Sequence, residues 1–76
     1  MNTLEQLNNI ISDVLGQKVE LTMNTDLMTD LSLNSLDIME MIVQVEDTFD
    51  VSISDRTIRS IKTAADVIRL IEQQKS

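Results

Sequence analysis

The sequence predicts an all-α protein, a small four-helix bundle with a short third helix and a long loop between the first two helices. Three observations lead to this fold class. The 76-residue chain is 42% apolar, contains one glycine and no proline, and has almost no aromatic residues. Sandwiches and barrels need many tight turns, which such a composition does not supply. The length suits one domain, and we expect residues 1–76 to form it.

The first helix is expected over about residues 4–15. Thr3 and Gln6 have the spacing of a capping box, and Gly16 is a suitable C-terminal stop. The apolar residues between them recur at helical spacing and are Leu4, Leu7, Ile11, Val14 and Leu15. This pattern predicts an amphipathic helix with one face in the core.

Residues 17–33 show no sustained periodicity and are rich in Thr, Asn and Asp. A connection of this length in a small domain is usually functional or held down by its own side chains. The apolar residues available for this purpose are Val19, Leu21, Leu27, Met28 and Leu31. We expect them to hold the loop against the helices.

The second helix, over residues 35–49, carries two apolar stripes. The first stripe predicts the core face and consists of Ile38, Met41, Ile42, Val45 and Phe49. Leu36, Met39 and Val43 form a second stripe roughly on the opposite side of the helix. A bundle of this size cannot bury both faces, so one stripe needs another explanation.

Two interpretations of the second stripe remain open. The long loop could fold over it, or it could be an exposed surface that binds other proteins. Carboxylates flank the stripe, as expected for an interface rim, and they are Asp37, Glu40, Glu46, Asp47 and Asp50. Methionine in such a stripe suits a surface that must fit several partners.

The C-terminal third is expected to contain a short helix and a longer one. Val51 and Ile53 alternate with polar residues in an extended link, after which Asp55 can cap a brief helix. The final helix is expected to open at Thr63, with Asp66 three residues on. Its core residues are then Val67, Ile68 and Ile71.

The net charge of −7 is concentrated in one segment. Residues 20–55 hold nine acids and no Lys or Arg, whereas the rest of the chain holds four acids and six bases. This acidity either keeps a solvated surface soluble or forms a docking surface for basic partners. It excludes nucleic acid as a direct ligand, because the phosphates would be repelled.

The residue types that are missing argue against an enzyme. The chain has no cysteine and therefore no thiolate nucleophile. It has no histidine, which is the residue that most often shuttles protons and binds metal ions. We expect no metal cofactor, although Asp30, Asp37 and Glu40 are the acids best placed to share a divalent cation. No basic leader and no apolar run of about 20 residues is present, which predicts a cytoplasmic protein that does not insert into membranes.

Ser35 stands at the expected start of the second helix. The simplest role for a serine at this position is the N-cap, in which its hydroxyl accepts a hydrogen bond from a free backbone N–H. Helix N-termini also favour phosphate groups, because unpaired amides and the positive end of the dipole lie there. A phosphodiester on Ser35 would therefore lie in a favourable field, next to the second stripe.

The sequence resembles the acyl carrier protein family over essentially the whole chain. The residues that match the family signature are Leu31, Ser32, Leu33, Asn34, Ser35 and Leu36. The acidic residues that match its recognition helix are Asp37, Glu40, Glu46 and Asp47. Phe49, Val51 and Ile53 match the apolar run that follows.

The resemblance implies that Ser35 carries 4′-phosphopantetheine, derived from coenzyme A, and that the thiol of this arm holds acyl groups as thioesters. It implies a monomer that meets a phosphopantetheinyl transferase, acyltransferases, ketosynthases and other biosynthetic enzymes with basic surfaces. The expected partner-binding residues are Leu36, Asp37, Met39, Glu40, Val43, Glu46 and Asp47. The expected acyl-pocket residues are Met41, Val45, Ile58, Ile61 and Ile68.

Three features depart from the family pattern. Asn34 replaces the usual aspartate, Ser32 replaces a frequent glycine, and the short third helix is basic through Arg56 and Arg59, with Lys62 following. The pathway therefore stays open between fatty-acid, polyketide and related biosynthesis. The alternative functions are an aminoacyl or peptidyl carrier and an unmodified acidic interaction module.

Overall fold

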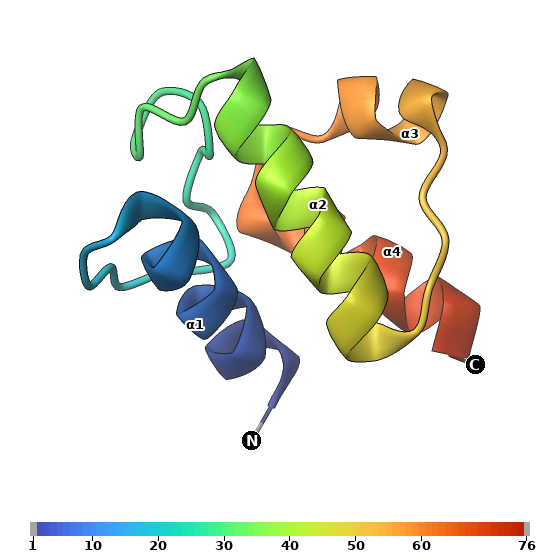
Figure 1. The fold of residues 1–76 in the computed structure, drawn as a ribbon. Coiled ribbons are helices and arrows are strands. Elements are labelled where there is room, and N and C mark those ends of the chain that lie inside the picture. The colour runs from blue at the N-terminus through green and yellow to red at the C-terminus, as the bar shows by residue number, and fades with distance from the viewer. Residues whose placement is uncertain (1, 76) are drawn as a thin grey trace.

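The computed structural model describes residues 2–75 and contains four α-helices within that range. They are α1 (Thr3–Leu15), α2 (Ser35–Phe49), α3 (Asp55–Ser60) and α4 (Ala64–Lys75). The described residues form no strand, only an isolated antiparallel bridge between Asp26 and Thr63. The prediction of an all-α fold with a short third helix and a long first loop is confirmed (Figure 1).

Helix α1 packs against α2 and α4, while α3 lies apart from α1 on the other side of α2 (Figure 1). The predicted core face of α2 is confirmed, because all five residues of its first stripe are buried. The buried residues of the other segments are Leu7, Ile10, Ile11, Leu21, Leu27, Leu33, Val51, Ile61, Ala64, Val67, Ile68 and Ile71. Burial of this apolar surface is what holds the helices together.

The first half of the long loop is fixed to α1 by a polar side chain. The Asn8 amide donates to the Val19 carbonyl at 2.8 Å, and its Oδ1 accepts from the Leu21 N–H at 2.7 Å. Leu21 and Leu27 are buried as predicted. The prediction was wrong for Met28, which is 49% exposed and therefore does not anchor the loop.

The second half of the loop is fixed to the turn between α3 and α4. The Leu27 N–H donates to the Lys62 carbonyl at 2.8 Å, and the Ala64 N–H donates to the Thr25 carbonyl at 3.1 Å. Asp66 stiffens the same turn by accepting from the Lys62 and Thr63 N–H groups, which lowers the pKa of its carboxyl. These contacts tie the middle of the long loop to the turn that joins α3 and α4.

Two predicted helix caps were wrong by one residue. Helix α1 is capped by Asn2, whose Oδ1 accepts from the Glu5 N–H at 2.8 Å, and not by Thr3. Helix α3 is capped by Ser54 and not by Asp55. The stop at Gly16 is confirmed, with φ of 69° in the left-handed region that glycine adopts without strain.

The opening of the last helix is confirmed. The Thr63 Oγ1 accepts from the Asp66 N–H at 3.3 Å, and the Asp66 carboxylate accepts from the Thr63 N–H at 3.1 Å. This reciprocal pair is a capping box and starts α4 at Ala64.

Candidate functional site: the start of helix α2 and its cavity

Ser35 is the first residue of α2, and the N-cap is the preceding residue, Asn34. The Asn34 Oδ1 accepts from the Asp37 N–H at 2.8 Å. In return, the Asp37 carboxylate accepts from the Asn34 N–H at 3.3 Å. This capping box pairs the N–H groups of Asn34 and Asp37 without using Ser35.

The Ser35 hydroxyl is therefore available for chemistry. Ser35 is exposed, and within residues 2–75 no hydrogen bond occupies its side chain. The interpretation of Ser35 as the N-cap is wrong, because Asn34 holds that position. A phosphodiester on this hydroxyl would stand at the positive end of a 15-residue helix.

The turn before Ser35 is anchored by Leu33. Leu33 is buried, and its N–H donates to the Leu27 carbonyl at 3.2 Å. Ser32, where the resemblance noted above implies a frequent glycine, has φ of 56° in the left-handed region. A residue with a Cβ is strained there by about 1–2 kcal/mol. The sharp turn thus explains why glycine suits this position and what its replacement costs.

The second apolar stripe of α2 is exposed, which overturns the alternative that the long loop folds over it. The exposed fraction of Leu36 is 69%, and Met39 and Val43 are also exposed. Glu40 and Asp47 are exposed beside the stripe, whereas Asp37 and Glu46 are half-buried. The expected partner-binding residues thus lie together on one helix, as an apolar strip with a carboxylate rim.

Two of the acids on this surface also have structural roles. The Asp37 carboxylate belongs to the capping box, and the Glu46 carboxylate accepts from the Ile53 N–H at 2.8 Å. The expected cation site is not supported, since no three acidic residues of the described chain come close enough to hold a metal ion. Asp30 instead accepts from the Asp26 N–H at 2.8 Å, which keeps its carboxylate within the loop.

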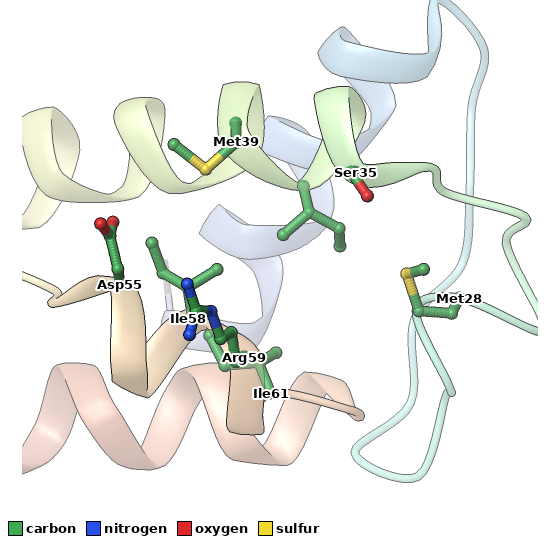
Figure 2. A pocket seen from close by; sticks show the side chains of 8 residues that line it. Met28, Ser35, Met39, Asp55, Ile58, Arg59 and Ile61 are labelled. Carbon is green, nitrogen blue, oxygen red and sulfur yellow. The ribbon is translucent and has the colours of Figure 1, made fainter.

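A cavity of about 520 Å³ opens beside Ser35, between the first half of α2 and α3. Figure 2 shows Ser35 at one end of this space, Met28 of the long loop beside it, and the side chains of α3 across from α2. The apolar residues of its wall are Met28, Ile38, Met39, Ile58 and Ile61. Asp55 and Arg59 complete the lining from α3.

The structure brings only some of the expected acyl-pocket residues to this cavity. Ile58 and Ile61 line it. Met41, Val45 and Ile68 are buried deeper in the core and do not contribute to its lining. Their role as pocket residues stays a prediction that requires the cavity to extend inward when cargo enters.

Four lining residues were not singled out as site residues of any kind from the sequence. Ile38 carried a signal, because it lies three residues after Ser35 and so on the same side of the helix. Asp55 and Arg59 share a side of α3 by their spacing of four. Met28 had no usable signal, because its place depends on the path of the long loop.

Comparison with known proteins gives a consistent result. A family model described as a phosphopantetheine attachment site matches residues 5–71. The acyl carrier protein of Coprothermobacter proteolyticus is 41% identical over 69 residues, covering 90% of this chain and 84% of the relative.

Solved structures agree with the fold. A putative acyl carrier protein from Mycobacterium tuberculosis has a TM-score of 0.90 at 33% identity, covering 96% of this chain and 99% of that one. The solution structure of a holo acyl carrier protein from Geobacter metallireducens has a TM-score of 0.85 at 24% identity, covering 99% and 87%. At 24% identity, the likeness to the second structure shows a shared fold alone.

The four-helix fold and the match to a phosphopantetheine attachment model define a carrier-type protein whose cofactor is 4′-phosphopantetheine. The chain belongs to the acyl carrier protein family. Members of this family carry intermediates and are not enzymes. None of the helices among residues 2–75 has the length and hydrophobicity needed to cross a membrane.

Proposed function

We propose that Ser35 is the attachment site of the 4′-phosphopantetheine arm and that the protein carries acyl groups on it as thioesters. The observation that carries this proposal is the exposed Ser35 hydroxyl, which the Asn34 cap leaves without a partner. When bound, the arm supplies the thiol that this cysteine-free chain lacks. Ser35 contributes the hydroxyl oxygen, and the amides at the start of α2 favour the phosphate.

The exposed strip of α2 supports a role in docking. Leu36, Met39 and Val43 offer an apolar centre next to the attachment site, and Glu40 and Asp47 offer fixed negative charge at its edge. Opposite charges speed encounter, and apolar contact then holds the complex. We therefore propose that the transferase and the acyl-handling enzymes approach this strip with basic surfaces.

The cavity supports transient protection of the cargo. It begins at Ser35 and is walled mainly by Ile and Met side chains, so an acyl group entering it leaves water. Cargo in fatty-acid, polyketide or related biosynthesis would fit this arrangement. The acyl carrier relative favours acyl cargo over the aminoacyl or peptidyl alternative. A cytoplasmic, monomeric state remains our prediction.

The proposal is tested by intact mass after incubation with coenzyme A and a broad-specificity phosphopantetheinyl transferase. The unmodified chain should gain one arm, Ser35→Ala should gain none, and Ser32→Ala should be loaded normally. Ser32 is the matched control because it lies exposed in the same turn. An arm mapped to Ser32 would refute the assignment, and a chain that takes no arm would favour the unmodified interaction module.

A further inference from the structure

The cavity beside Ser35 contains a polar feature that an acyl pocket does not require. Its lining includes Asp55 and Arg59, which are four residues apart on α3 and extend from the same side of that helix. In Figure 2 both side chains leave α3 toward the space beneath Met39. A carboxylate and a guanidinium therefore stand opposite the apolar wall that α2 provides.

Neither charged group is engaged within the protein. The ion pair present in residues 2–75 joins Asp66 to Arg69, and no side-chain hydrogen bond or ion pair of the described chain involves Asp55 or Arg59. Both residues are exposed at the cavity. Their donors and acceptors are thus hydrated and available to a molecule that enters.

A purely local role for the two charges has to be considered. Asp55 is in the first turn of α3 and Arg59 is in its last turn. Each charge therefore interacts favourably with the nearer end of the helix dipole. This role depends on position along the helix and not on the side that faces the cavity. Arg56 is on the same helix, is exposed and does not line the cavity, so it controls for the loss of a positive charge from α3.

The chemistry of the pair favours one kind of cargo. A fully reduced alkyl chain in the cavity would displace water from Asp55 and Arg59 and offer no hydrogen bond in return. A carbonyl can accept from the Arg59 guanidinium, and a hydroxyl can also donate to the Asp55 carboxylate. A carboxylate on the cargo would be attracted by Arg59 and repelled by Asp55, so the pair is best matched to a neutral oxygen function.

We propose that Asp55 and Arg59 are specificity-determining residues that make the cavity favour acyl groups retaining a hydroxyl or carbonyl over fully reduced chains. The inference rests on the proposed function, because the cargo reaches the cavity from an arm on Ser35. The apolar wall receives the hydrocarbon part of the cargo, and the α3 side receives its oxygen.

The test compares two arms of equal length, octanoyl and β-hydroxyoctanoyl. Each is transferred from its coenzyme A thioester to the intact chain by a broad-specificity transferase, and intact mass confirms loading. The rate of thioester cleavage by hydroxylamine then reports how far each cargo is sheltered. The variants are Arg59→Gln, Asp55→Asn and, as control, Arg56→Gln, with circular dichroism of each unloaded chain to verify folding.

In the unmutated chain we expect the hydroxyl to slow cleavage relative to octanoyl by roughly two- to tenfold, which is the net effect of one hydrogen bond to a hydrated, exposed group. Arg59→Gln and Asp55→Asn should each reduce this ratio toward one, and Arg56→Gln should leave it unchanged. An equal ratio in all four chains, or an equal loss in Arg56→Gln, would overturn the inference while leaving loading at Ser35 intact. A chain that accepts no arm would overturn the proposed function and this inference together.

Discussion

The two faces of α2 are built from the same residue types and behave in opposite ways. Met41 is 0% exposed and Met39 is 45% exposed, although they are two positions apart. Val45 and Val43 differ in the same way, at 0% and 60%. Residue type therefore does not distinguish the core from the proposed docking surface on this helix, whereas position around the helix does.

The difference shows what each face requires. A buried methionine contacts neighbours on all sides, so its loss leaves a cavity whose energetic cost falls on the whole fold. An exposed methionine loses little when it is truncated, because water already surrounds it. The three exposed residues of the second stripe should therefore contribute little to stability, and this contrast can be tested directly.

The largest expected effect separates the two methionines. Met41→Ala should lower the free energy of unfolding by about 2–5 kcal/mol, while Met39→Ala should change it by less than about 0.5 kcal/mol. Urea denaturation in moderate salt measures both. If Met41→Ala does not fold, Met41→Leu, which conserves volume, should cost less than about 1.5 kcal/mol. Equal losses of unfolding free energy at Met39 and Met41 would contradict the difference between the two faces.

The next effect concerns cargo on the side of α2 that faces the cavity. Each CH₂ that enters it should contribute about 0.8 kcal/mol, so melting temperature should rise with acyl length until the space is filled. Ile58→Phe, at the half-exposed rim of the cavity, should flatten this trend by occupying the space. Thermal melts of a homologous acyl series provide the measurement, and a melting temperature independent of length would show that cargo stays outside.

A smaller effect is expected on the exposed face. Glu40→Lys should slow loading by the transferase severalfold and make it less sensitive to salt, while changing stability by only about 0–1 kcal/mol. Glu72→Lys is the matched control, because it makes the same charge change at an exposed position of α4. Should both variants slow loading equally, net charge and not the docking strip would be responsible.

The smallest effect on stability is expected at Ser32, in the turn that precedes α2. Ser32→Gly should stabilise the fold by about 0.5–1 kcal/mol, since relief of the left-handed strain exceeds the added freedom of the unfolded chain. Ser52→Gly, at a residue without positive φ, should not stabilise. Chemical denaturation checks the pair, and stabilisation by Ser52→Gly would contradict the explanation.

The sequence predicted the helices of this fold well because the spacing of apolar residues follows which side of each helix is buried. The spacing of Ile38, Met41, Ile42, Val45 and Phe49 identified the core face of α2 without any knowledge of its neighbours. The second stripe was found on the same helical wheel, because recognising either stripe requires only the geometry of a single helix. Whether the long loop covers the second stripe stayed open, because that depends on contacts between distant segments, and the structure shows the stripe exposed.

Caps and loop contacts could not be predicted in the same way. At Asn2–Thr3, Asn34–Ser35 and Ser54–Asp55 two adjacent residues are both good caps, so local propensity does not decide between them. In each case the structure uses the first residue. The place of Met28 and the anchoring by Asn8 likewise depend on contacts between distant segments.

Because Asn34 caps α2, the helix start does not depend on whether the Ser35 hydroxyl is free or modified. A serine that capped its own helix would lose that bond whenever its oxygen was esterified, so folding and loading would compete. Here the capping box is complete before any transferase arrives. An arm could be added, removed and replaced on the same polypeptide without unwinding the helix, so that the carrier would outlast any one of its prosthetic groups.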